Sequence, residues 1–229
     1  MSELTASGRE QLQLSDALTV RTNALCLGLE DGVADILELV TPTTAELLRW
    51  WFGAEMTAAR NGLNFHPGQR QAILNTIVAH EVLACVTLKD LYQQVAADAL
   101  LHGNRLSEVS QAKHAHPKYC LKMATGTGKT WVLQALLIWQ LLNKSAALEA
   151  GVDDARFTRH FLLVAPGLIV YERLLDAFLG TEVGGVRDFS SSDVARYAEL
   201  FIPQSCRERV FGFVRGNTCG KAGIGLKAT

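Results

Sequence analysis

Apolar residues recur at helical spacing in the part of the chain that follows Pro42. The pattern predicts an amphipathic helix over residues 44–60. Four apolar residues fall on one face of this helix: Leu48, Phe52, Met56 and Ala59. Thr43 and Glu46 have the spacing of a capping box, in which each side chain binds a free backbone N–H of the first turn. We therefore expect the helix to begin at these residues.

Two more helices are predicted before a polar loop at residues 102–117. One follows the segment 65–69, and the other covers residues 88–101. In the first of them, three apolar residues are spaced to face a core: Ile73, Ile77 and Val78. The pattern of residues 1–41 fits both short strands and helical turns, so the structure of that segment is left open.

The second half of the chain alternates between strand and helix patterns. Residues 119–123 form a short strand candidate, and after a glycine-rich turn residues 131–142 are strongly helical. A second apolar strand is predicted over residues 160–165, followed by a helix over residues 169–179. Strand, glycine turn, helix and strand in this order predict an α/β fold with a doubly wound parallel sheet.

The last forty residues have weaker patterns. A helix is predicted to begin near Phe189, and residues 210–214 fit a strand. The segment 216–229 is rich in glycine, with no clear period.

Composition limits the kinds of site that this chain can carry. Of its 229 residues, 48% are apolar and 20% are charged, as in an ordinary globular protein. Lys and Arg total 22 against 23 for Asp and Glu, so the net charge is −1 and no overall basic field attracts nucleic acid or membrane surfaces. Any site for a polyanion must therefore be local.

The cysteines and the N-terminal segment indicate a cytoplasmic protein without a membrane partner. The five cysteines are widely spaced and form no Cys-x-x-Cys pair, which favours free thiols in a reducing compartment. Residues 1–16 are polar and lack the apolar core of a signal peptide. The longest apolar stretch, Trp131–Leu142, contains two glutamines and is too short to span a bilayer.

The segment Met123–Thr130 has the chemistry of a phosphate-binding loop. Between a strand and a helix, Gly126 and Gly128 permit a tight turn whose backbone N–H groups surround a phosphate at the positive end of the helix dipole. Lys129 can reach the β- and γ-phosphates, and the Thr130 hydroxyl can ligate Mg²⁺. We assign Lys129 and Thr130 as catalytic residues, with Thr130 as the metal ligand. The loop residues expected to contact the nucleotide are Ala124, Thr125, Gly126, Thr127, Gly128, Lys129 and Thr130.

Three motifs in this order resemble those of superfamily-two helicases. Met123 replaces the first glycine of the general phosphate-loop pattern, and Met-Ala-Thr-Gly-Thr-Gly-Lys-Thr resembles their motif I. Phe65–Gln69 resembles their glutamine motif, and Leu163–Gly167 resembles motif Ia. The sequence over about residues 42–215 as a whole resembles the restriction (helicase) subunit of type III restriction enzymes.

This resemblance implies a fold, ligands and further site residues. The implied fold is an α/β, RecA-like, three-layer sandwich with a parallel sheet, preceded by a mostly helical extension. Gln69 is implied to contact adenine, and Pro166 and Gly167 to lie near a bound nucleic-acid strand. The implied cofactors are ATP and Mg²⁺, and the implied partners are DNA and, for the full-length protein, a modification methyltransferase subunit. In that protein, ATP hydrolysis would drive motion on DNA.

The resemblance also implies a division of the chain. We expect an N-terminal extension over residues 1–60 and the first RecA-like ATP-binding domain over residues 61–229. Phosphoryl transfer to water also needs a second carboxylate on the metal, which this family takes from an Asp-Glu box. No Asp-Glu dipeptide follows Thr130. The expectation is therefore a fragment that ends before motif II and lacks the nuclease domain.

Other interpretations of these residues remain open. The chain could be a non-catalytic module that holds nucleotide as a structural ligand or not at all. A phosphate-loop kinase for a small molecule is disfavoured by Met123 and by the helical segment before the loop. Gln69 also fits a solvated residue at a helix start, and Pro166 and Gly167 also fit a simple turn between a strand and a helix.

Overall fold

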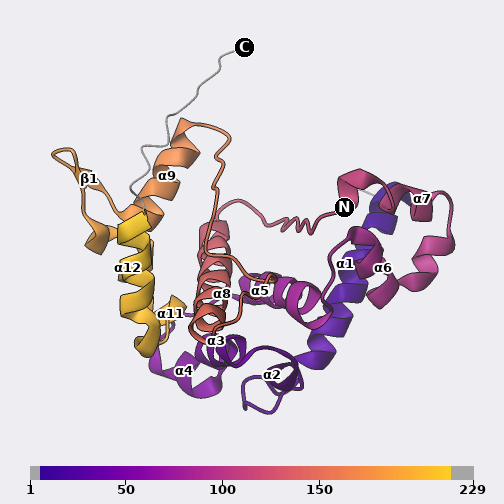
Figure 1. Ribbon diagram of the computed structural model, residues 1–229, viewed down its shortest axis with the longest axis horizontal. Coiled ribbons are helices and arrows are strands. Elements are labelled where there is room, and N and C mark those ends of the chain that lie inside the picture. Colours follow the sequence, from indigo (N-terminus) through magenta and orange to yellow (C-terminus); the bar gives the residue numbers. More distant parts are fainter. Residues whose placement is uncertain (1–5, 218–229) are drawn as a thin grey trace.

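The computed structural model describes residues 6–217, which are mostly helical (Figure 1). The predicted tail extends to residue 229, and its residues 218–229 lie outside the described part. The helices of the first half are α1 (Ala6–Leu25), α2 (Ile36–Leu39), α3 (Pro42–Phe52), α4 (Ala54–Ala59), α5 (Pro67–Ile77), α6 (Leu88–Val95) and α7 (Arg105–Val109). Those of the second half are α8 (Lys129–Glu149), α9 (Leu168–Leu179), α10 (Asp193–Arg196), α11 (Ala198–Phe201) and α12 (Arg207–Asn217).

Helix α8 lies at the centre of the molecule. Helices α3 and α5 pack against it, α1, α6 and α7 lie on one side, and α9 and α12 lie on the other (Figure 1). The largest buried side chains are Trp51 of α3, Trp139 of α8 and Phe201 of α11. The Trp51 indole donates to the Phe201 carbonyl at 2.9 Å, which joins segments 150 residues apart in the chain. The main core contains residues from both sides of residue 60, and the domain division at that residue stays a prediction.

Several predicted helices are confirmed. Ile73 and Ile77 of α5 lie in the core, as does Val78, the first residue of a π-helical turn that extends to Val82. Helices α8 and α9 cover the segments predicted from their apolar spacing. The predicted helix 88–101 is α6 followed by a 3₁₀ turn, Ala97–Leu101. The open question about residues 1–41 is resolved for residues 6–41, where α1 and α2 form.

The predicted helix over residues 44–60 is wrong in its start and in its continuity. The N-cap is Thr41, whose Oγ1 accepts from the Thr44 N–H at 3.1 Å, and Pro42 occupies the first helical position. The helix breaks at Gly53 because the Ala54 N–H donates to the carbonyl of Glu30, a distant residue, at 2.9 Å. The long helix is therefore two helices, α3 and α4.

Arg60 satisfies the carbonyls that this break leaves free. Its Nη2 donates to the carbonyls of Trp50 and Trp51 at 2.6 and 3.1 Å, and its Nε donates to that of Met56 at 2.9 Å. A guanidinium group at the end of a helix also interacts favourably with the helix dipole. Burial lowers the pKa of Arg60 from its ordinary value.

The expected RecA-like sandwich with a parallel sheet is wrong for this structure. The one sheet within residues 6–217 is an antiparallel pair, β1 (Glu182–Val183) and β2 (Val186–Arg187). The predicted strands 119–123 and 160–165 lie outside any sheet. Two short strands are too few to form a stable sheet, and a parallel sheet also needs layers over both faces.

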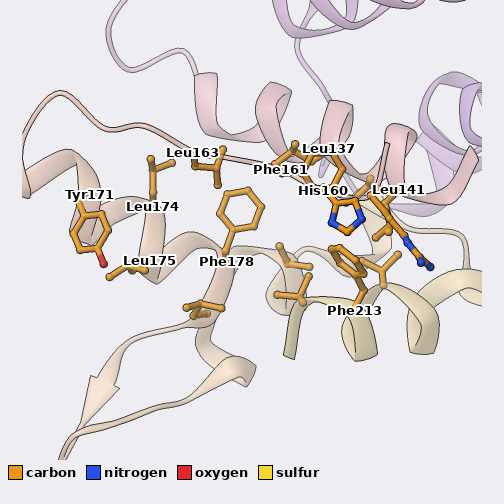
Figure 2. A pocket seen from close by; sticks show the side chains of 16 residues that line it. Leu137, Leu141, His160, Phe161, Leu163, Tyr171, Leu174, Leu175, Phe178 and Phe213 are labelled. Atoms are coloured by element: carbon orange, nitrogen blue, oxygen red, sulfur yellow. The ribbon is translucent and has the colours of Figure 1, made fainter. Parts of the chain in front are cut away.

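Alternate residues of the second predicted strand, Phe161 and Leu163, instead border an open cavity of about 650 Å³. Figure 2 shows Phe161 and Leu163 of this segment around the cavity with Leu141 of α8, Phe178 of α9 and Phe213 of α12. The alternate residues point away from this side, and Leu162 and Val164 are 88% and 81% exposed. The side chains of this segment therefore alternate as in a β-strand, but no strand within residues 6–217 pairs with it.

The predicted strand over residues 210–214 is also wrong, because this segment is the middle of α12. Val210, Phe213 and Val214 recur at the helical spacing of three and four residues and line the same cavity. The predicted helix near Phe189 is a 3₁₀ turn, Phe189–Ser191, followed by α10. Within residues 6–217, no helix is long and apolar enough to cross a membrane.

A buried polar network joins the start of α3 to α8 through Glu81 in the π-helical turn. The Glu81 carboxyl accepts from the Thr41 N–H at 2.6 Å, from the Thr44 hydroxyl at 2.8 Å and from the Trp139 indole at 3.1 Å. The Asn143 amide donates to the Thr44 hydroxyl at 2.9 Å. Because buried polar groups are costly when unpaired, this network fixes the middle of α8 relative to α3 and α5.

We expect Glu81→Ala to lower the free energy of unfolding by about 2–4 kcal/mol, because it leaves several buried donors without their acceptor. Urea denaturation measures this change. Glu38→Ala removes an exposed carboxylate in α2 and should stay within about 0.5 kcal/mol of the wild type. Equal losses in the two variants would contradict a structural role for the network.

Candidate functional site

The segment Met123–Thr130 forms a turn that leads directly into α8. Gly126 and Gly128 both adopt positive φ, +80° and +68°, and Gly128 is the N-cap of α8 in the left-handed region. Lys129 is the first residue of this 21-residue helix, and Thr130 is the second. The positive end of the helix dipole and free backbone N–H groups therefore lie at the loop.

The Lys129 side chain folds over the start of the loop. Its ammonium group donates to the carbonyls of Met123 and Ala124 at 3.1 and 2.7 Å. The Thr127 hydroxyl donates to the same Ala124 carbonyl at 2.7 Å. Lys129 is exposed, so its ammonium can exchange these carbonyls for phosphate oxygens without any change in the core.

Gln69 of α5 holds the other side of the loop. The side chain is 3% exposed, and its Nε2 lies 3.2 Å from the Thr127 carbonyl and 3.3 Å from the Gly128 carbonyl, donating to both. Its Oε1 accepts from the His66 backbone N–H at 3.0 Å. The alternative in which Gln69 is a solvated residue at a helix start is therefore wrong. Its contact with adenine stays a prediction.

His66 is the N-cap of α5 and also reaches the loop. Its Nδ1 accepts from the backbone N–H groups of Gly68 and Gln69, at 3.0 and 3.4 Å, and its Nε2 lies 3.0 Å from the Thr127 carbonyl. None of the motifs in the sequence assigns a role to His66. The spacing of His66 and Gln69 is that of a capping box, and this signal could have identified the pair.

Pro166 and Gly167 lie at the exposed start of α9. Gly167 has φ of 174°, an extended conformation that any residue adopts, and its carbonyl accepts from the Tyr171 N–H at 3.0 Å. No hydrogen bond within residues 6–217 joins this turn to the phosphate loop. The structure thus brings Gln69 to the loop, and the nucleic-acid contact of Pro166 and Gly167 stays a prediction.

The acidic pair after α8 is engaged in ion pairs. Asp153 binds the Lys144 ammonium, and Asp154 lies 2.7 Å from Arg156. The side-chain hydrogen bond from Arg156 lowers the pKa of Asp154 below its ordinary value. No group of three His, Cys, Asp or Glu residues in the described part of the chain has the arrangement of a metal site. Thr130 is half-buried in the first turn of α8, and its role as a Mg²⁺ ligand stays a prediction.

Two of the free cysteines are buried, unreactive thiols. The four within residues 6–217 are free: Cys26, Cys85, Cys120 and Cys206. Burial raises the pKa of Cys26 and of Cys85 to about 11, so both thiols stay protonated at neutral pH. At the loop, the groups that can bind a ligand are backbone N–H groups, the Lys129 ammonium and the hydroxyls of Thr127 and Thr130.

A glycine-rich turn with an exposed lysine at the N-terminus of a long helix defines a candidate phosphate-binding site. Comparison with known families agrees with this class: the model of the type III restriction enzyme res subunit matches residues 63–205. The chain belongs to this family, whose members have a helicase-like, ATP-binding domain. Searches of curated proteins and of solved structures gave no match.

We expect Gly128→Ala to damage the loop more than Gly126→Ala does. A Cβ on Gly128 would lie 2.3 Å from the Gln69 Nε2, whereas a Cβ on Gly126 has nothing within 4 Å. Both substitutions place alanine at positive φ, which costs roughly 1–2 kcal/mol. Gly128→Ala should lower the free energy of unfolding by about 1 kcal/mol more, because Gln69 loses its two carbonyl acceptors.

Urea denaturation of the two variants measures this difference. In a Gln69→Ala background the collision is removed, so the excess loss of Gly128→Ala over Gly126→Ala should disappear. An excess that persists without the Gln69 side chain would contradict the contact as its cause.

Proposed function

We propose that this chain binds Mg²⁺-ATP at the loop Ala124–Thr130. The observation that carries the proposal is the geometry of the loop, in which Gly128 is left-handed at the N-cap of α8 and Lys129 is exposed beside it. A left-handed N-cap before a long helix presents successive N–H groups to an anion, and the lysine adds a full positive charge. Membership of the type III restriction enzyme res subunit family supports ATP as the ligand.

In this proposal each site residue has a separate role. Lys129 moves from the carbonyls of Met123 and Ala124 to the β- and γ-phosphates, and the Thr130 hydroxyl ligates Mg²⁺. Gln69 contacts adenine. Both N–H groups of its amide already bind loop carbonyls, so contact through Nε2 requires the exchange of one of these bonds.

We further propose that the chain is the ATP-binding portion of a DNA helicase or translocase. The N-terminal residues 1–60 are the extension, and residues 61–229 belong to the ATP-binding domain. In the whole protein, ATP hydrolysis would be coupled to motion on DNA, with a modification methyltransferase subunit as a partner. Family membership supports the nucleotide and the DNA in general terms.

Mg²⁺-ATP should stabilise the wild-type chain in a thermal-shift titration, because a ligand that binds the native state raises its stability by mass action. At about ten times its dissociation constant, the gain is about 1.4 kcal/mol, or roughly 3–5 °C in Tm. Lys129→Ala should abolish the shift. Lys122→Ala, which removes an exposed lysine before the loop, should retain it.

Omission of Mg²⁺ is the second arm of this titration and should reduce the wild-type shift, since Thr130 would lose the metal that it holds. Absence of any shift in folded wild-type protein would contradict ATP binding. An equal shift in the wild type and in Lys129→Ala would show that ATP binds elsewhere.

DNA binding is expected to depend on the exposed basic residues before the loop. Lys122→Glu should weaken the gel shift of single- and double-stranded DNA at low salt, and added salt should weaken it further in all variants. Arg21→Glu changes the charge equally at an exposed position of α1 and should have little effect. DNA binding by the wild type no stronger than that of a neutral control protein would contradict the proposal.

A further inference from the structure

We propose that His66 is a positioning residue for phosphate binding, acting through the Thr127 and Gly128 carbonyls. The proposal rests on the proposed nucleotide site and assigns to it a residue that the motifs do not include. We refer to the side chains of His66 and Gln69 together as the α5 clamp. The α5 clamp holds two consecutive peptide groups of the loop, and it does so from the first turn of a different helix.

The hydrogen bonds of the His66 ring determine which nitrogen carries the proton. Nδ1 lies near two backbone N–H groups, those of Gly68 and Gln69, so this nitrogen must be the acceptor. In the neutral ring the proton is then on Nε2, which donates to the Thr127 carbonyl at 3.0 Å. A single imidazole thus caps α5 and binds the loop at the same time.

Gln69 completes the clamp and is oriented by the backbone of residue 66. The His66 backbone N–H donates to the Gln69 Oε1 at 3.0 Å, which turns the Nε2 toward the loop carbonyls. The Thr127 carbonyl therefore receives one hydrogen bond from each side chain, and the Gly128 carbonyl receives one from Gln69. The Trp131 N–H donates a further bond to the Gly128 carbonyl at 3.0 Å.

The consequence for phosphate binding follows from the planarity of the peptide group. In a trans peptide, the C=O of one residue and the N–H of the next point in opposite directions. No cis peptide bond occurs in the described part of the chain. Because the carbonyls of Thr127 and Gly128 point toward α5, the N–H groups of Gly128 and Lys129 point away from it. These are the N–H groups that a phosphate would meet at the start of α8.

The residues next to His66 are suited to this arrangement. Pro67 occupies the first position of α5, where its missing N–H has no cost. A Cβ on Gly68 would lie 3.0 Å from the His66 Cε1 and 3.4 Å from its Nδ1, so the glycine leaves room for the ring. The sequence His-Pro-Gly-Gln therefore builds the cap and the contact to the loop together.

A role as a helix cap alone does not account for His66. Asn, Asp, Ser and Thr are the residues that usually cap helices, and each does so with a short side chain. Only a longer side chain with a second polar atom can accept from α5 and donate to the loop. The Nε2 contact with Thr127 is the feature that a cap would not need.

The test separates the cap from the contact with the loop. His66→Asn keeps an N-cap acceptor, because the Asn side-chain oxygen takes the place of Nδ1, but its side chain is too short to reach the Thr127 carbonyl. We expect the stability of this variant to match that of the wild type and its Mg²⁺-ATP affinity to be about three- to tenfold weaker, as for the loss of one hydrogen bond. Calorimetric titration of the full chain measures the affinity.

A matched control guards against a general loss of stability. Thr87→Ala removes the N-cap of α6, where Thr87 and Asp90 form a capping box of their own. This variant should lose stability by about 1 kcal/mol and keep wild-type affinity for Mg²⁺-ATP. If the two variants lose the same stability but only His66→Asn binds Mg²⁺-ATP more weakly, the result still supports the positioning role.

An NMR readout follows the N–H groups themselves. Mg²⁺-ATP should move the amide resonance of Gly128 strongly in the wild type and less in His66→Asn, which a purely structural role would not produce. Wild-type affinity and an unchanged Gly128 shift in His66→Asn would overturn the inference and leave the proposed function intact. Absence of ATP binding by the wild type would overturn both.

Discussion

The site depends on the orientation of two peptide groups, those that begin with the Thr127 and Gly128 carbonyls. Hydrogen bonds from α5 turn these carbonyls toward the protein, and the N–H groups that follow them are thereby turned toward solvent at the start of α8. The turn itself favours glycine at position 128, since its φ is positive and a Cβ would lie 2.3 Å from the Gln69 Nε2. Because these N–H groups are oriented before a ligand binds, the entropic cost of ordering the loop on binding is reduced.

Helix α5 and its π-helical extension contact α8 at two separate places. At the start of α5, His66 and Gln69 bind the loop that precedes α8. After its end, Glu81 accepts from the indole of Trp139, ten residues along α8 from Lys129. Glu81 lies in the π-helical turn Val78–Val82 that continues α5. Because α8 is held at both places, its N-terminus and its dipole keep a fixed direction relative to α5.

The local parts of this site were predictable, and the contacts between distant segments were not. Glycine, lysine and threonine at their spacing predicted a loop before a helix, and α8 begins at Lys129 as that pattern requires. The cap at Thr41 was also within reach of the sequence, because Pro42 marks the first helical position. The break at Gly53 was not, since it depends on a carbonyl of Glu30 and on the side chain of Arg60. Nothing in the spacing of Gln69 pointed to the carbonyls of Thr127 and Gly128.

The prediction of a parallel sheet was the largest error. The absence of that sheet within residues 6–217 shows which elements support the phosphate loop instead. Periodicity predicted strands around Leu121 and Leu163, but a strand also needs neighbours, which a local pattern does not contain. A loop between a strand and a helix is usually held from the strand side by a sheet. Here the preceding segment has no ladder, so the loop relies on α8 itself and on the α5 clamp. The conformation of the loop is therefore a property of helix packing, and the residues that fix it, His66 and Gln69, lie at the start of α5 rather than in a strand.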